Sequence, residues 1–541
     1  MSGLGDNFAS YAVVCATSAL LSAGATTVIL DATSAWGVVE VEPGADVVAV
    51  PHPAPEPLSV AVPAPPGAPN VVFLMWDTVR ADRLSLYGHR RPTTPALSRI
   101  AADGAVWDRA ISPSFWTVPS HASLFTGLPV RAHGTDAANP WLADRQTTLA
   151  EWFRDHGWAT WAFTANPNIS PDTNLAQGFD VLLDQSVEPW GTRARAEVAA
   201  KAIPDDASSP RSPAWPAGRL EGSAKDAGPV ASAALLDWLD EKGPGDKPFF
   251  AFINFMEVHA PRLPSRDARR AVGLVGGAAT LALRTPAGFE DLARANRSEK
   301  PYTRAEDEAM RAVYDASVWE LDRVTGELID ALDQRGHRDD TVVVIVSDHG
   351  DEIGEHRLYG HNFSVYDTLV RVPLVIRGPG VAHGRHRAPV STAGLFGTLA
   401  HLARIPVEGA LTLDTAAPVA ELTWAHGIKP GLPDRDADGT FLPNRRRFTA
   451  IYDARWKLIR SSAGELELFD LDRDPAEERN LAGDALDRVA ALETAMDSWL
   501  EGTPRPPDIP LPDEERQRRR DARRDGSDQQ AAELAALGYV Q

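Results

Sequence analysis

The chain has 541 residues, 43% of them hydrophobic, and a formal net charge of -21 at pH 7. A chain of this length and composition can bury a large core, which excludes a disordered protein. The negative charge argues against a nucleic-acid partner, because binding to a phosphate backbone requires a basic surface. The one cysteine, Cys15, excludes an intramolecular disulfide and a zinc site built from cysteines.

Residues 1–30 contain a segment without charged side chains, at 8–30. This segment is long enough to span a bilayer, which needs about 20 apolar residues, but it is rich in Ala, Ser and Thr. No Lys or Arg precedes it, in contrast to a secretory signal. A membrane anchor, a cleaved signal and a soluble helix are therefore all open. An anchor or a signal predicts a location in the cell envelope or outside the cytoplasm. The proline-rich residues 31–69 predict an extended spacer.

Alternating strand and helix signals begin at Asn70 and predict an α/β domain over 70–440, with a largely parallel sheet. Within this domain, residues 186–229 are polar and rich in Pro, Ala and Arg. This composition predicts a surface insertion, which we expect near the mouth of the site.

Three apolar runs predict buried strands, at 71–76, 249–255 and 341–347. Asp77 follows the first run, His259 lies shortly after the second, and Asp348 and His349 follow the third. In open α/β sheets, ligands bind beyond the carboxyl ends of the strands. These four side chains are therefore expected to converge on one site.

A threonine, Thr117, stands two residues before a proline in the segment FWTVPSHASLFTG. One interpretation is structural: Thr117 is a helix-entry residue, and the helix ends at Gly127. The other interpretation is chemical. Thr117 is then a nucleophile at the positive end of that helix, where an anionic substrate would bind.

A divalent ion would support the chemical interpretation. Asp77, Asp348, His349 and the hydroxyl of Thr117 offer three oxygen ligands and one imidazole nitrogen, a set suited to one divalent ion. Such an ion lowers the pKa of a bound hydroxyl and screens the charge of an incoming phosphate or sulfate.

Four further side chains are candidates for transition-state stabilisation or for protonation of the leaving group: His121, His259, His361 and Lys457. For each of them, a structural role with a hydrogen-bonding partner is the alternative.

The motifs NVVFLMWDTVRADRLSLYG, FWTVPSHASLFTGL, INFMEVHAPR, VSDHGDEIGEHRLYGHNF and ARWKLI follow one another in the chain. Their order resembles the sulfatase family of the alkaline-phosphatase superfamily, with gaps, from about Asn70 to the final ALGYV. The resemblance implies a central mixed sheet flanked by helices and a smaller C-terminal α+β subdomain at 441–541. It also implies metal-dependent hydrolysis of sulfate or phosphate esters.

The resemblance also assigns roles by position. It implies three metal ligands: Asp77, Asp348 and His349. It puts Thr117 at the family's nucleophile position. Three residues fall at or near the substrate-contacting histidine and lysine positions: His259, His361 and Lys457.

The departures from the family pattern bear on the chemistry. The family has Cys or Ser in place of Thr117, oxidised to formylglycine within a Cys-x-Pro-x-Arg signal, and His121 here replaces the arginine. Threonine cannot form that aldehyde, which favours phosphoester or phosphonate chemistry over sulfate chemistry. The second aspartate expected after the first strand is Thr78, and FTANPNIS, at 163–170, replaces a Gly-Lys-x-His segment. The lost carboxylate favours Mn or Zn, with Ca or Mg as alternatives.

The sequence therefore predicts a metal-dependent ester hydrolase, or a transferase, that uses Thr117 as its nucleophile. Its substrate would be a small-molecule, glycan or lipid ester, with a phosphodiester or phosphonate favoured. An arylsulfatase-like hydrolase of sulfuric esters is the first alternative. An inactive binding protein on the same fold is the second, because a fold does not guarantee activity.

Overall fold

The computed structural model describes residues 62–136, 139–185, 187–201, 225–241, 243–296, 298–361, 364–422 and 447–505. The candidate membrane segment at 8–30 lies outside these residues. Among the residues that are described, no helix is both long enough and apolar enough to cross a bilayer. The end of the proline-rich spacer is described, and it lies against the α/β domain, because the Val62 N–H donates to the Asp155 carbonyl at 2.8 Å.

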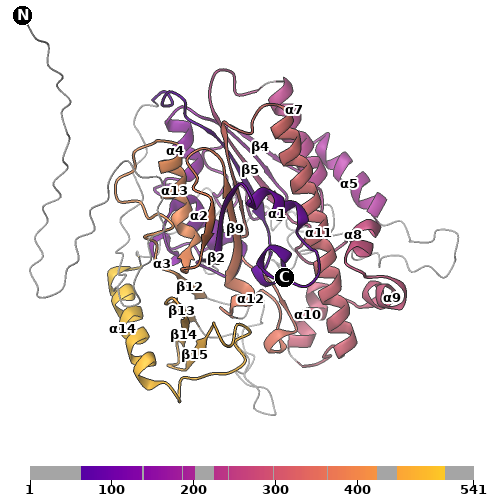
Figure 1. Ribbon diagram of the computed structural model, residues 1–541, viewed down its shortest axis with the longest axis vertical. Helices are drawn as coiled ribbons and strands as arrows, with labels where there is room; N and C mark the ends of the chain where they lie inside the picture. Colours follow the sequence, from indigo (N-terminus) through magenta and orange to yellow (C-terminus); the bar gives the residue numbers. More distant parts are fainter. Residues whose placement is uncertain are drawn as a thin grey trace, which may run out of the picture. The chain divides into compact units, whose positions relative to one another are not determined.

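The described chain forms a central sheet of nine strands, flanked by helices (Figure 1). The strands are β1 (Asn70–Trp76), β2 (Gly104–Ile111), β3 (Ala159–Thr164), β4 (Val181–Asp184), β5 (Phe249–Phe255), β6 (Thr341–Val346), β9 (Arg371–Arg377), β10 (Gly384–His386) and β11 (Val390–Ser391). Their order is β10-β2-β9-β6-β1-β5-β3-β4, and β11 pairs with β2. Strand β9 runs antiparallel to β2 and β6, while the other pairs are parallel. The predicted mixed α/β sheet is confirmed.

The helices that flank this sheet are α1 (Pro95–Ala101), α2 (Thr117–Thr126), α3 (Val130–His133), α4 (Leu149–Asp155), α5 (Trp190–Lys201), α7 (Gly228–Glu241), α8 (Arg266–Ala271), α9 (Gly276–Arg284), α10 (Phe289–Asn296), α11 (Arg304–Gln334), α12 (Asp367–Val370) and α13 (Leu395–Leu402). Short 3-10 turns occur at Ala81–Arg83, Ser85–Tyr87, Glu355–Arg357 and Thr392–Gly394. A small hairpin pairs β7 (Glu352–Ile353) with β8 (Tyr359–Gly360).

Strand β1 shows why the apolar runs form the middle of the sheet. All seven of its residues are buried, as is typical of a strand covered on both faces. Val71, Phe73 and Met75 belong to the core that includes residues of α2, α4 and α13. The alternate side chains of β1 belong to a second core, which includes residues of α1, α7 and α11. Figure 1 shows these two groups of helices on opposite sides of the sheet.

The register of the central strands fixes the position of the site. Trp76 at the end of β1 pairs with Phe255 at the end of β5, and Met75 pairs with Val346 at the end of β6. These three parallel strands therefore end together, and the residues that follow them emerge at the same edge of the sheet.

A smaller antiparallel sheet forms the C-terminal part, in the order β12 (Val419–Leu422), β13 (Phe448–Tyr452), β14 (Trp456–Ser461) and β15 (Leu466–Asp470). Helix α14 (Leu486–Gly502) packs on it through residues such as Leu492 and Met496, which join Leu458 and Leu468 in one apolar cluster. This agrees with the predicted α+β architecture, but β12 precedes residue 441, so the sheet begins before the predicted boundary.

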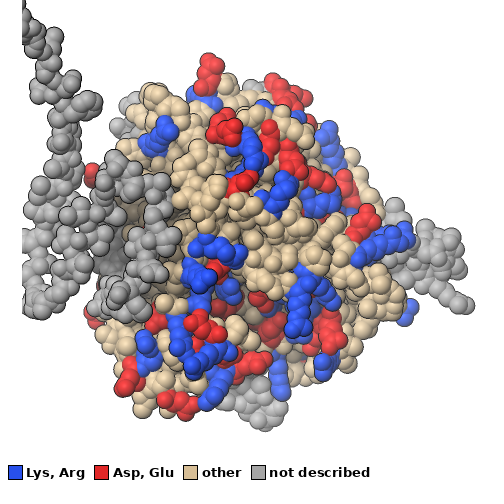
Figure 2. Space-filling view, in the orientation of Figure 1, with Lys and Arg blue, Asp and Glu red and all other residues tan. Residues whose placement is uncertain are grey.

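Residue 186 and residues 202–224 of the predicted insertion at 186–229 lie outside the described residues, and the described remainder is only partly a surface segment. Helix α5 within it is largely accessible, but Lys225, Asp226 and Ala227 are buried, and α7 starts at Gly228. Its last residues therefore belong to the core of the domain. On the face displayed in Figure 2, Lys and Arg side chains lie among Asp and Glu side chains.

Candidate active site

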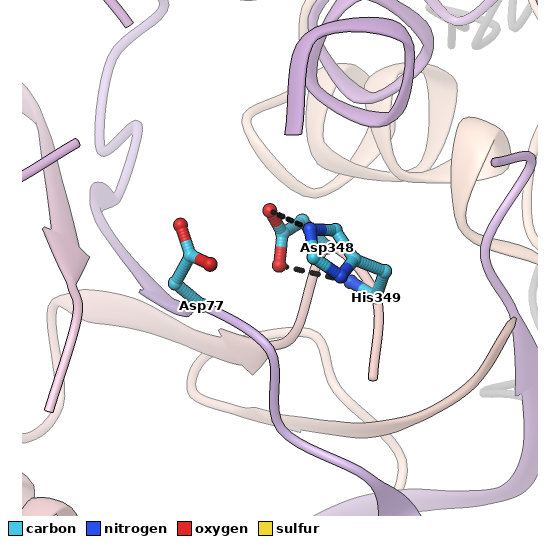
Figure 3. Close-up of side chains that lie close together, drawn as sticks. All are labelled: Asp77, Asp348 and His349. Carbon is cyan, nitrogen blue, oxygen red and sulfur yellow. Dashed lines mark hydrogen bonds and ion pairs between the residues drawn. The ribbon is translucent and has the colours of Figure 1, made fainter. Parts of the chain in front are cut away.

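Asp77, Asp348 and His349 meet at the edge where β1 and β6 end (Figure 3). All three side chains are fully buried, and their potential ligand atoms lie within 4.8 Å of one another. Strand β1 delivers Asp77 directly, whereas Ser347 separates Asp348 from the end of β6. The sequence-predicted convergence of these residues is therefore present in the structure.

Each of the three residues has one buried polar atom without a hydrogen bond: Asp77 Oδ1, Asp348 Oδ2 and His349 Nε2. Their other polar atoms have partners. Asp348 Oδ1 accepts hydrogen bonds from the backbone N–H groups of Thr78 at 3.2 Å and His349 at 2.9 Å. The His349 Nδ1–H donates to the Gly350 carbonyl at 2.8 Å, which leaves Nε2 with its lone pair. A buried polar atom without a partner is costly, and this donor set fits one divalent ion.

The electrostatics of the group also favour a cation. Burial, together with the neighbouring Asp348 carboxylate, raises the pKa of Asp77 to about 7. Burial raises the pKa of Asp348 to about 7 and lowers the pKa of His349 to about 4. The imidazole is thus neutral, and the two carboxylates need a nearby positive charge to ionise fully near neutral pH.

Thr117 is the first residue of α2, so the structural interpretation of its place in the chain is correct. Its side chain also belongs to the site. Thr117 Oγ1 accepts a hydrogen bond from Asn166 Nδ2 at 3.1 Å, and the same amide donates to Asp77 Oδ2 at 2.8 Å. One amide group therefore joins the candidate nucleophile to a candidate metal ligand.

His121 lies one turn further along α2. Its Nδ1–H donates to the Thr117 carbonyl at 2.9 Å, and this nitrogen lies 3.6 Å from Asp348 Oδ2. Burial lowers the pKa of His121 to about 3, so the ring is a neutral member of the site. The contact with Asp348 places His121 beside the candidate metal group.

His361 connects His349 with His259. The ring centroids of His361 and His349 are 4.6 Å apart, and those of His361 and His259 are 5.2 Å apart. His361 Nδ1 lies 3.0 Å from Asp351 Oδ1, and Arg262 forms an ion pair with the other oxygen of that carboxylate. The two predicted histidines therefore lie on the His349 side of the site.

Lys457 lies on β14 of the C-terminal sheet. Its buried ammonium pairs with Asp367 Oδ1 at 2.9 Å and with Glu477 Oε1 at 2.6 Å. These two carboxylates, on separate segments, explain why a lysine is buried here. The catalytic role implied by the family position stays a prediction.

Replacing Lys457 tests that role. Lys457→Met leaves Asp367 and Glu477 buried without their cation, and we expect the free energy of unfolding to fall by about 3–5 kcal/mol. Arg460→Met on the same strand removes a more accessible pair with Asp497 and should cost less than about 1 kcal/mol. Denaturant unfolding measures both variants. Unchanged stability with a large loss of kcat would instead support catalysis by Lys457.

Two asparagines of the site were not predicted. Asn166 follows the end of β3, and Asn254 is the next-to-last residue of β5, from which its amide donates to Asp77 Oδ2 at 3.3 Å. Both carry a signal in the sequence. Asn254 is a polar residue inside an apolar run, and Asn166 follows a fourth strand that ends at the same edge.

The fold and the site together define a class, that of α/β proteins with a buried carboxylate and histidine group, suited to a metal ion, at the ends of parallel strands. Within this class, the family model described as Sulfatase matches residues 69–405. The chain belongs to the sulfatase family, and it is a hydrolase that acts on sulfate or phosphate esters. The buried Asp77, Asp348 and His349 are consistent with the metal site of such enzymes.

Curated relatives include the arylsulfatase of Clostridium perfringens, which is 24% identical over 80% of this chain and 95% of that enzyme. The choline-sulfatase of Rhizobium meliloti is 36% identical, but the match spans only 32% of this chain and 33% of that enzyme.

Two kinds of solved structure share the fold. The phosphonate monoester hydrolase of Agrobacterium radiobacter superposes with a TM-score of 0.61 and 22% identity, over 80% of this chain and 96% of that chain. A structure in complex with its substrate D-glucosamine-2-N,6-O-disulfate has a TM-score of 0.57 and 18% identity, over 80% and 97% of the two chains. The fold thus occurs with phosphonate esters and with sulfated sugars.

Proposed function

We propose that this protein hydrolyses phosphodiesters or phosphonate monoesters, with Thr117 as the nucleophile. The observation that carries the proposal is the Asn166 amide, which donates to both Thr117 Oγ1 and Asp77 Oδ2. It ties the hydroxyl to the buried group of Asp77, Asp348 and His349. Threonine cannot supply the aldehyde that sulfatases of the usual kind employ, which favours phosphorus over sulfur as the atom attacked.

The residues divide the reaction between them. Asp77, Asp348, His349 and Thr117 would hold a divalent ion, which when bound lowers the pKa of the hydroxyl and screens the substrate's charge. Thr117 Oγ1 gives up its proton and forms a bond to phosphorus while the bond to the leaving oxygen breaks, and that oxygen takes up one proton in exchange. Hydrolysis of the resulting threonyl ester by water returns the hydroxyl.

The histidines serve the oxygens of the substrate. His259 and His361 adjoin each other beside His349, and this position supports our assignment of contacts with the non-bridging oxygens or with the leaving group to these two residues. The His259 Nδ1–H donates to the Ala260 carbonyl at 2.6 Å, so the Nε2 of the neutral ring is an acceptor, and it donates only when the ring carries a second proton.

The charges around the site favour a substrate group with a single negative charge. Among the described residues, the buried cations next to the histidines are paired, Arg262 with Asp351 and Lys225 with Asp226. Burial lowers the pKa of three histidines of the site, His121, His259 and His349. Two carboxylates and one divalent ion cancel, which leaves little charge to bind a dianionic phosphate monoester. A phosphodiester or phosphonate monoester carries one charge.

A panel of aryl esters with the same leaving group tests the proposal. We expect kcat/KM for the phosphodiester or the phosphonate to exceed that for the sulfate by at least about 100-fold, or roughly 2.7 kcal/mol of transition-state discrimination. The phosphate monoester is the control for charge and should also be slower than the diester. A preference for the sulfate ester would contradict the proposal.

The second candidate function is hydrolysis of sulfate esters, which the arylsulfatase and choline-sulfatase relatives favour. Thr117→Cys alone should not produce a sulfatase, because His121 replaces the arginine of the formylglycine signal. Thr117→Cys with His121→Arg is coexpressed with a formylglycine-generating enzyme. This double variant distinguishes the effect of the nucleophile on sulfate turnover from the effect of the surrounding pocket. If mass spectrometry shows the aldehyde and sulfate turnover rises, the rest of the pocket accepts sulfate.

A further inference from the structure

We infer that Asn166 is a positioning residue for the nucleophile, an inference that rests on the proposed function of Thr117. Asn166 is fully buried and follows β3 in the segment 163–170. It contacts Thr117 Oγ1 and Asp77 Oδ2 at once. Its part in the reaction is to hold the attacking oxygen in one orientation.

A hydrogen bond to the carbonyl oxygen of the Asn166 amide fixes the orientation of its NH2 group. Asn166 Oδ1 accepts a hydrogen bond from the Asn168 N–H at 3.0 Å, so the NH2 group must face Asp77 and Thr117. The backbone is held as well. The Asn166 N–H donates to Thr164 Oγ1 at 3.2 Å, and that hydroxyl donates to the Asn166 carbonyl at 2.9 Å. Exchanging the oxygen and nitrogen of the amide would break the hydrogen bonds to the Asn168 N–H and to Asp77 Oδ2.

This arrangement has a chemical consequence at Thr117. An amide nitrogen has two hydrogens and can only donate, so one hydrogen serves Asp77 Oδ2 and the other serves Thr117 Oγ1. The hydrogen of the hydroxyl must then point away from Asn166. The amide hydrogen bond strengthens as negative charge develops on Oγ1, because hydrogen bonds to ionised acceptors are stronger than those to neutral ones. Asn166 thus favours the reactive form of the hydroxyl and restricts its rotation.

The same amide also orders Asp77. Asn166 and Asn254 both donate to Asp77 Oδ2, whereas Asp77 Oδ1 has no hydrogen bond. The two amides together therefore decide which carboxylate oxygen is presented to a metal ion. Asn254 provides a comparison, since its amide supports Asp77 from another strand.

The test compares Asn166→Ala and Asn166→Asp with the wild type, and uses Asn168→Ala as the matched control. Asn168 contributes its backbone N–H to the amide of Asn166, which the substitution retains. At saturating metal, we expect both Asn166 variants to lower kcat by about 10- to 100-fold with KM within about threefold of the wild type. Asn168→Ala should stay within about threefold in both. Asn166→Asp retains the shape but has no N–H, so it separates hydrogen-bond donation from packing.

Metal content and thermal unfolding provide readouts besides activity. Asn166→Ala should retain about one divalent ion per chain when metal is in excess, while Asn254→Ala should weaken metal binding. A kcat within about threefold of the wild type in both Asn166 variants would overturn the inference. Recovery of full kcat on adding metal would also overturn it, because Asn166 would then act only by orienting Asp77 for metal binding. If Thr117→Ala retains turnover, the proposed function fails instead, whatever the Asn166 variants show.

Discussion

Thr117→Ala is expected to lower kcat by at least about 10³-fold, because it deletes the attacking oxygen, and loss of a nucleophile removes most of an enzyme's chemical rate enhancement. The fold should persist. Thr117 is the first residue of a helix whose other residues are buried, and alanine is a good helix former. Steady-state kinetics on the best ester of the panel measures the effect, with thermal unfolding and metal analysis on the same samples.

Thr117→Ser is the matched control, because it keeps the hydroxyl and loses only a methyl group. It should turn over at least about 10-fold faster than Thr117→Ala. Turnover by the alanine variant close to that of the wild type would refute the nucleophile assignment. Loss of folding would show that the threonine serves the entry of α2 and would leave the attacking group to be found elsewhere.

The candidate metal group of Asp77, Asp348 and His349 could be predicted from the sequence because these residues come at or just after the ends of two predicted strands. Asp77 and Asp348 follow long apolar runs, and parallel strands bring such ends to one edge of a sheet. Met75 pairs with Val346, so β1 and β6 end at nearly the same height in the sheet and the residues after them lie close together. No single residue has to be oriented by a distant partner for this prediction to succeed.

The antiparallel direction of β9 could not be predicted from the sequence. Its segment, Arg371–Arg377, is an apolar run like β6, and an apolar run does not show whether a strand is parallel or antiparallel to its neighbours. Strand β12 illustrates a second limit. It is four residues long and pairs with Phe448–Tyr452 across an intervening segment, so neither its length nor its spacing marks it as part of the C-terminal sheet.

Side-chain partners were the least predictable feature. Asn166 faces the site because Asn168 and Thr164 fix its turn, and those hydrogen bonds have no periodic signature. The resemblance of the sequence implies substrate contact for Lys457, and the structure pairs its buried ammonium with Asp367 and Glu477. Charges distant in sequence decide whether a buried lysine is structural, and the sequence does not show which of them meet.

Asp348→Asn is expected to abolish stoichiometric metal binding and, with it, turnover. The substitution replaces a carboxylate by a neutral amide, and its NH2 group would lie at or beside the Oδ2 position, which has no hydrogen bond and lies 3.4 Å from His349 Nε2. Metal analysis of the wild type should give about one divalent ion per chain, with Mn or Zn in preference to Ca. Asp322→Asn is the matched control, since Asp322 is a buried carboxylate with a pKa raised to about 7 that binds the N–H groups of Ala96 and Leu97. It should lose stability but keep metal.

The pH dependence of metal stabilisation follows from the same carboxylates. Without a cation, burial raises the pKa of Asp77 and Asp348 from 3.8 to about 7, so between these values the folded state binds more protons than the unfolded state. The free energy of unfolding of the metal-depleted protein therefore receives a contribution from these groups that falls as the pH rises toward 7. A bound cation removes this loss because it favours the ionised carboxylates.

We thus expect the increase in Tm on adding metal to be larger at pH 8 than at pH 5.5. Buried neutral histidines also affect stability at acidic pH, but they act on both metal-free and metal-bound protein and largely cancel in this difference. Differential scanning calorimetry with and without a chelator measures it, and Asp348→Asn should show little increase at either pH. An equal increase in Tm at both pH values in the wild type would contradict the assignment, because it would show that the ion binds without displacing protons from Asp77 and Asp348.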